Sequence, residues 1–119
     1  MKLNRDEIRV AKVLDKLEIN WQRNFTGFNY IDEYSNKRKF HPDFYIKDFD
    51  CYIEYKGWIT SQISHKMDDA LKRNNFRLIV VYSNDKRYSN LGLNLSQIEE
   101  DSNLLLTACR YGSFGSPKP

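Results

Sequence analysis

Two acidic residues and a lysine stand out in the stretch HPDFYIKDFDCYIEYKGW, which covers residues 41–58. Asp43 follows a proline, whereas Glu54 and Lys56 interrupt a run of aromatic and β-branched residues that is typical of a buried strand. Charged side chains are rarely buried without partners, so a functional reason for their position has to be considered.

Two neighbouring strands would bring these charges together. Side chains alternate along a strand, so Glu54 and Lys56 share one face, and a turn at residues 47–50 would place Asp43 beside them. Two carboxylates in a partly dry site repel each other unless a divalent cation neutralises them, and such hard oxygen ligands suit magnesium or manganese. The ion lowers the pKa of water and stabilises charge on a phosphate, while an ammonium group orients the attacking water or holds the scissile phosphate. The pattern therefore predicts metal-dependent phosphodiester hydrolysis.

A helix and three strands are expected before and around these residues. Asn4 and Glu7 have the spacing of a capping box that opens an amphipathic helix over residues 5–18. One strand interrupted at Gly27 is predicted in residues 21–34, and a basic hairpin loop in residues 35–39. Further strands are predicted at residues 40–46 and from residue 51 to 55 or beyond, which together give a three-stranded meander.

A second helix and a buried strand follow. Thr60 or Ser61 can cap the helix, which is expected to end near Asn74. The apolar run at residues 77–82 predicts a strand buried on both faces. Beyond it, a short helix is expected at residues 96–101, and residues 104–111 are compatible with a strand or with a packed terminal segment.

Length and composition limit the class of protein. The chain has 119 residues, of which 40% are hydrophobic and 29% charged, so one folded domain is expected over residues 1–111, with a flexible tail at residues 112–119. The net charge of +3 permits an anionic partner without requiring one. No apolar run of about 18 residues and no signal-peptide pattern are present, so we expect a cytoplasmic protein without a membrane partner. Cys51 and Cys109 lack the spacing of a metal clip or a redox pair.

The charged residues resemble a known signature. Pro42-Asp43, then ten residues, then Glu54-Tyr55-Lys56 is similar to the PD-(D/E)XK motif of metal-dependent nucleases. The resemblance implies that Asp43 and Glu54 bind Mg²⁺ or Mn²⁺, that the Tyr55 carbonyl is a further ligand, and that Lys56 is the catalytic lysine.

The expected order of elements also resembles that superfamily. Over residues 4–83 it is similar to the restriction-endonuclease-like αβββαβ core, an α/β fold with a mixed central sheet flanked by helices. Related nucleases often add a glutamate from the first helix, and Glu7 is the matching position, where it would support the metal or its water. A glutamate there also completes a capping box without any catalysis, so both roles remain open. The small size resembles phage-type and Holliday-junction-resolving endonucleases, which implies DNA as the partner, branched DNA as a candidate substrate, and a homodimer as a candidate assembly.

Each charged residue also has an ordinary structural explanation. Asp43 can be a carboxylate beside a turn, and Glu54 and Lys56 can form a pair on a solvated sheet surface. The alternative function is a non-catalytic DNA-binding or assembly module that keeps the nuclease fold. The intact set of three charges argues against this alternative, because burial penalises all of them.

Several other side chains could contact DNA. Two basic groups could bind backbone phosphate or simply be solvated: Lys37, Arg38 and Lys39, and Lys66, Lys72 and Arg73. Three aromatic residues could stack on unpaired bases, although core packing is their more common role: Trp21, Tyr52 and Trp58. His41 and His65 do not have the spacing of a metal-ligand pair.

Overall fold

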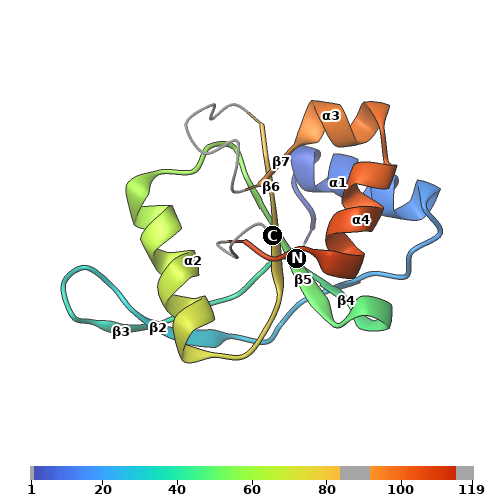
Figure 1. Cartoon of the computed structure of the whole chain (residues 1–119). Coiled ribbons are helices and arrows are strands. Elements are labelled where there is room, and N and C mark those ends of the chain that lie inside the picture. The colour runs from blue at the N-terminus through green and yellow to red at the C-terminus, as the bar shows by residue number, and fades with distance from the viewer. Residues whose placement is uncertain (1, 84–91, 115–119) are drawn as a thin grey trace.

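The computed structural model describes residues 2–83 and 92–114 and forms an α/β fold around a mixed five-stranded sheet (Figure 1). In spatial order the strands are β1 (Gln22–Arg23), β4 (Phe44–Ile46), β5 (Cys51–Lys56), β6 (Leu78–Tyr82) and β7 (Leu93–Asn94). The first three strands pair antiparallel, and β5, β6 and β7 pair parallel. A separate hairpin consists of β2 (Phe28–Ile31) and β3 (Lys37–Phe40).

Helices cover both faces of this sheet. They are α1 (Arg5–Lys16), α2 (Ser61–Arg73), α3 (Leu95–Glu100) and α4 (Asn103–Tyr111), and a single 3₁₀ turn, η1 (Lys47–Phe49), joins β4 to β5. In Figure 1, α2 lies on one side of β5 and β6, and α1, α3 and α4 lie on the other. The β2–β3 hairpin packs against α2.

Two hydrophobic clusters hold the layers together. Every residue of β6 is buried, which confirms the strand predicted from its unbroken apolar run. Ile79 and Val81 belong to the cluster with α1, α3 and α4, whereas Leu78 and Val80 belong to the cluster with α2. The two-residue alternation of a strand thus divides one apolar run between both cores.

The capping signals of α1 and α2 are confirmed. The Asn4 side chain accepts a hydrogen bond from the Glu7 amide, and the Glu7 side chain accepts one from the Asn4 amide, so the capping box is complete. The Thr60 hydroxyl caps α2, which ends at Arg73 with Asn74 as its C-cap.

The strand predicted at residues 21–34 is wrong as a single element. It is divided into β1 and β2, which belong to different sheets. The break is stabilised by Asn24, whose side chain accepts from the Thr26 amide and donates to the Pro42 carbonyl. Gly27 lies so close to His41 that a Cβ atom there would be 2.6 Å from the imidazole Nε2. A side-chain pattern cannot reveal where a strand changes its pairing partner.

The strand predicted at residues 40–46 is also divided, so the three-stranded meander is wrong. Residues 41–43 separate β3 from β4. The basic residues predicted in a loop lie in β3 instead, because the turn falls earlier, where the Asp32 carboxylate accepts from the amides of Tyr34 and Asn36.

The C-terminal segment is helical. Residues 103–111 form α4, so of the two alternatives left open the strand is wrong and the packed segment is confirmed. Residues predicted within the tail also pack, since Phe114 is buried and its amide donates to the Leu78 carbonyl. Residues 115–119 of that predicted tail lie outside the described residues.

Arg77 fastens this segment to the N-terminal end of β6. Its guanidinium donates to four backbone carbonyls, those of Phe49, Ala108, Cys109 and Gly112.

Cys51 and Cys109 are both buried free thiols.

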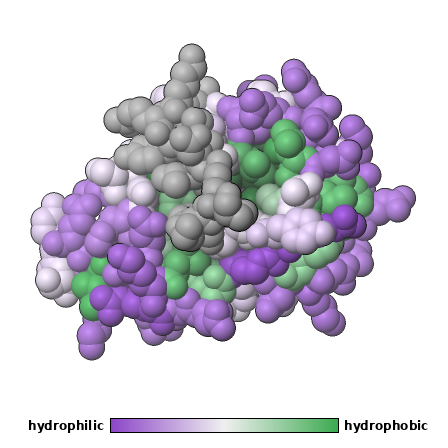
Figure 2. Space-filling view, viewed as in Figure 1, coloured by the Kyte–Doolittle hydropathy of each residue, from purple (hydrophilic) through white to green (hydrophobic). Residues whose placement is uncertain are grey.

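The surface seen in Figure 2 is mainly hydrophilic around α2 and the hairpin, and hydrophobic side chains gather around α3 and α4. Within residues 2–83 and 92–114, no helix has the length and apolarity needed to cross a membrane.

Candidate active site

The predicted carboxylates meet where the β4–β5 ladder ends. Phe44 pairs with Ile53, and the same register extended by one residue places Asp43 opposite Glu54. At this point side chains replace backbone pairing. The Asp43 amide donates to Glu54 Oε1 over 3.1 Å, and the Tyr55 amide donates to Asp43 Oδ2 over 2.8 Å. Each carboxylate is therefore oriented by a backbone amide across from it, Glu54 by that of Asp43 and Asp43 by that of Tyr55.

The backbone of Asp43 is held from its other side by the residue that follows β1. The Asn24 amide donates to the Asp43 carbonyl over 3.0 Å, and the Asn24 side chain donates to the Pro42 carbonyl over 2.9 Å. Asp43 therefore lies between two anchored segments although it belongs to no strand.

Lys56 lies two residues after Glu54 on the same face of β5, as predicted. Its Nζ atom is 3.3 Å from Glu54 Oε2. Only 3% of Glu54 is exposed. Each oxygen of this buried carboxylate has a protein partner, the Asp43 amide for Oε1 and Lys56 Nζ for Oε2. Each oxygen has about two lone pairs, so capacity for a further ligand remains.

Glu7 reaches the same site from α1. It is 8% exposed, and burial is the main cause that raises the pKa of its carboxyl, with a further contribution from a side-chain interaction with Asp43. The Asn4 amide of the capping box lowers this pKa. The hydroxyl of Tyr55 donates to Asp6 over 2.8 Å, which ties the start of α1 to β5. Glu7 thus completes the helix cap and also contacts Asp43, so the two roles proposed from the sequence are compatible.

Asp43 interacts with three of these residues, Glu7, Glu54 and Tyr55. Burial raises its pKa to about 6, and the negative charge of Glu54 adds to the increase, while the Tyr55 amide partly opposes it. The folded chain therefore collects acidic groups that repel one another when ionised.

The donor set fits a hard divalent cation. Among residues 2–83 and 92–114 there is no group of three or more His, Cys, Asp or Glu side chains arranged as a metal cage. Magnesium, however, is usually held by one or two carboxylates and completes its shell with water and substrate phosphate, so Asp43 and Glu54 are a sufficient pair. The N–H and C=O groups of one strand residue point to the same side, so the Tyr55 carbonyl faces the side on which its amide meets Asp43.

Arg23 was missed by the sequence reasoning. Its Nε and Nη1 atoms are buried, and no hydrogen-bond partner for them is found in the described part of the chain. Arg23 lies on β1 beside β4, and its positive charge lowers the pKa of Glu7. Buried donors without partners are costly, so an anionic ligand that accepts hydrogen bonds from this guanidinium would be favoured. The signal available in the sequence was the two-residue spacing between Trp21 and Arg23, which would put both side chains on one side of an extended segment.

Lys66 was predicted only as part of a surface stripe with Lys72 and Arg73. Burial lowers the pKa of Lys66, and the charge of Lys56 lowers it further, while Glu54 and Asp43 oppose the shift. Its Nζ atom lies 5.2 Å from the centre of the Phe40 ring. Lys66 is therefore within electrostatic range of the carboxylates. Lys72 is exposed, and Arg73 pairs with Asp69 over 2.6 Å.

The aromatic candidates divide into packed and exposed residues. Trp21 packs edge-on against Phe44, and Tyr52 lies in a ring cluster with Phe28 and Phe76. Trp58 is 60% exposed just beyond the end of β5 and is the one of the three that is open to a ligand.

Comparisons with protein-family models, curated protein sequences and solved structures find no match for this chain. A proposal for the function of this chain therefore rests on the geometry and charge of the residues described above.

Proposed function

We propose that this protein is a divalent-metal-dependent nuclease that hydrolyses DNA phosphodiester bonds. The observation that carries the proposal is the meeting of Asp43, Glu54 and Lys56 at the end of the β4–β5 ladder, where both carboxylates are anchored and the ammonium lies 3.3 Å from one of them. Glu7 joins them from α1.

Asp43 and Glu54 would hold Mg²⁺ or Mn²⁺, with the Tyr55 carbonyl as a further oxygen ligand. When bound, the ion would supply charge neutralisation at the phosphate and a lowered pKa for water. The protein contributes ligands whose orientation is fixed before the ion arrives, because backbone amides already bind each carboxylate.

The basic side chains would act on the phosphate and the water. Hydrolysis forms a bond from a water oxygen to phosphorus, breaks one ester P–O bond and delivers a proton to the leaving oxygen. Lys56 would orient the water or hold a phosphate oxygen, and Glu7 would support the metal or its water. Two buried donors of the Arg23 guanidinium, which have no partner among residues 2–83 and 92–114, would match a phosphate oxygen and stabilise the charge that develops there.

The architecture supports the same proposal. A mixed sheet with helices on both faces, in which α2 connects the parallel strands β5 and β6, is compatible with the restriction-endonuclease-like core expected from the sequence. The site lies at the carboxyl end of β5, the end at which ligands bind in many open α/β sheets.

The test is cleavage of a panel of linear duplex, single-stranded, flapped and four-way-junction DNA, with magnesium, manganese or a chelator. The variants are Glu54→Gln and Lys56→Ala, with Lys72→Ala as a control because Lys72 is exposed on α2. We expect metal-dependent cutting that both site variants lose and the control keeps, with DNA binding retained in all three. Sedimentation of the protein with each DNA would test the expected homodimer.

The alternative class has a distinct outcome in the same assay. DNA that is bound by the wild-type protein but never cut, whatever the metal, would overturn the nuclease and favour the non-catalytic DNA-binding module. If the protein binds none of these DNAs and cuts none of them, both the nuclease and the DNA-binding module are excluded.

A further inference from the structure

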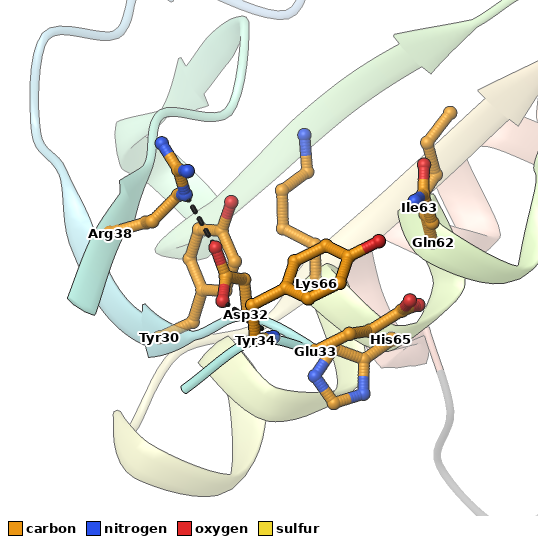
Figure 3. Close-up of a pocket in the computed structure, with 9 residues that line it drawn as sticks. All are labelled: Tyr30, Asp32, Glu33, Tyr34, Arg38, Gln62, Ile63, His65 and Lys66. Carbon is orange, nitrogen blue, oxygen red and sulfur yellow. Dashed lines mark hydrogen bonds and ion pairs between the residues drawn. The ribbon is translucent and has the colours of Figure 1, made fainter. Parts of the chain in front are cut away.

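A hollow between the β2–β3 hairpin and α2 has no role in the chemistry proposed above. Its volume is about 330 Å³ (Figure 3). Its main lining residues, which define the hairpin hollow, are Tyr30, Tyr34 and Arg38 from the hairpin side and Gln62, His65 and Lys66 from α2.

The two walls of the hairpin hollow are fixed to each other. α2 supplies side-chain partners to the backbone of β2: His65 Nε2 lies 3.1 Å from the Ile31 carbonyl, and the Asp69 carboxylate accepts from the Ile31 amide over 2.7 Å. Further along, the Asn74 side chain donates to the Asn29 carbonyl over 2.9 Å. These bonds set the width of the hollow before any ligand enters.

The charges of the lining residues balance. Asp32 and Glu33 are acidic, Arg38 and Lys66 are basic, and Arg38 pairs with Asp32 over 2.7 Å. A neutral hollow does not favour a free phosphate, but it suits a neutral planar group that can hydrogen-bond. His65 provides one such contact: the Ile31 carbonyl can only accept, so the proton is assigned to Nε2, and Nδ1 is left as an acceptor.

Aromatic surface is also available. Tyr34 is 76% exposed, and in Figure 3 its ring extends from the hairpin across the opening of the hollow. Every nucleobase has a flat face that can stack on such a ring. The volume is at the small end of the roughly 300–1,000 Å³ typical of ligand pockets, which suits one base rather than a base pair.

Lys66 connects this hollow to the carboxylates. It lines the hollow and is also within electrostatic range of Asp43 and Glu54. In Figure 3 its ammonium points away from the His65 ring. A nucleotide whose base lies in the hollow could therefore place its phosphate at Lys66.

We propose that the hairpin hollow binds one unpaired nucleobase of the DNA strand that is cut, stacked on Tyr34, with the adjoining phosphate at Lys66. The inference rests on the proposed nuclease function and deepens it, because it names DNA with a single-stranded segment or branch as the substrate class. A fully paired duplex cannot offer such a base without extruding it, which requires energy for unstacking and unpairing.

The experiment measures DNA binding in chelator, so that no cleavage is needed. Flapped DNA carrying 2-aminopurine at the first unpaired position is compared with blunt duplex by anisotropy and by fluorescence quenching. Tyr34→Ala removes the ring, Tyr34→Phe keeps it, and Tyr111→Ala is the matched control, because Tyr111 is 81% exposed on α4.

We expect Tyr34→Ala to bind flapped DNA about ten-fold more weakly, to lose the quenching, and to bind blunt duplex as the wild type does. Tyr34→Phe and Tyr111→Ala should match the wild type on both DNAs. An unchanged affinity for flapped DNA in Tyr34→Ala, or an equal loss on blunt duplex, would overturn the subsite. Metal-dependent cutting with no effect of Tyr34 would reject the subsite alone, whereas a Tyr34-dependent affinity without any cutting would reject the nuclease alone.

Discussion

The backbone amide of Asp43 donates a hydrogen bond to the carboxylate of Glu54 over 3.1 Å, at the point where β4 and β5 stop pairing through their backbones. The Tyr55 amide completes the exchange by donating to Asp43. Glu54 is thus part of the sheet, whereas Asp43 directly precedes β4 and is held against β5 by the two hydrogen bonds of this exchange.

Replacing Asp43 with Asn should stabilise the metal-free protein at neutral pH. The pKa of Asp43 is raised from 3.8 to about 6, so the folded state favours the protonated acid. At pH 8 the cost of ionising the folded carboxyl is fully present, on the order of 3 kcal/mol at about 1.36 kcal/mol per pKa unit. Urea denaturation in chelator at pH 8 would measure the gain in the free energy of unfolding.

The pH dependence of the free energy of unfolding tests whether titration of Asp43 causes this gain. As the pH rises through about 4 to 6, wild-type stability should fall relative to Asp43→Asn, and below pH 4 the two proteins should converge. Asp48→Asn changes an exposed carboxylate on η1 and should behave as the wild type does. A stability difference that is equal at pH 4 and pH 8 would contradict the expected titration of Asp43.

Divalent cations should raise the stability of the wild-type protein. A ligand that binds only the folded state adds about 2.7 kcal/mol at 100 times its Kd. Denaturation with and without Mn²⁺ would measure this increase, which Asp43→Asn should lack. The increase should also decline as the pH falls below about 6, because a proton competes for the Asp43 carboxylate. Equal stabilisation of the variant would show that the ion binds elsewhere.

Replacing Arg23 with Met should reduce DNA cleavage about 10²- to 10³-fold, as expected for the loss of one donor to a developing phosphate charge. The stability of the free protein should not fall, because the two buried nitrogens that are lost are costly donors that have no hydrogen-bond partner in the described part of the chain. Single-turnover cleavage rates and urea denaturation would measure the two effects separately. Arg23→Lys keeps the charge without the planar fork and should recover only part of the rate. A large loss of stability in Arg23→Met would instead identify Arg23 as a structural residue.

Asn24→Ala should impair the site from the side of β1. The variant loses the side-chain bonds to Thr26 and to the Pro42 carbonyl, and we expect a loss of about 1–3 kcal/mol in the free energy of unfolding together with slower cleavage. Thermal or urea denaturation and cleavage rates on the preferred DNA would measure both. Asn36→Ala, at the hairpin turn, would test whether any loss of an asparagine has the same effect on cleavage, and we expect that it does not.

Local patterns were sufficient for several elements. The capping box at Asn4, the cap at Thr60 and the apolar run of β6 are short-range signals, and the structure confirms all three elements. The motif from Asp43 to Lys56 also lies within one hairpin, so strand alternation was enough to predict that its charged groups meet.

Long-range contacts were the part that local patterns could not supply. Nothing near residues 24–27 shows that β1 pairs with β4 while β2 pairs with β3, because each strand's partner is chosen by the rest of the fold. For the same reason Arg23 was missed, and Lys66 was predicted only as part of a basic stripe on the second helix and not as a neighbour of the carboxylates. The sequence around a single basic residue does not show whether folding will bury it near carboxylates, as it does here.

Arg77 and the charged cluster lie at opposite ends of the central strands. The Arg77 guanidinium gathers four carbonyls at the end where β6 begins, whereas Glu54 and Lys56 stand toward the opposite end, where the parallel strand β5 finishes. One end thus joins the C-terminal helix to the core, and the other concentrates charges that oppose folding. Because the two ends do not share residues, substitutions that stabilise the Arg77 end can offset the cost of the charged end without changing any residue there.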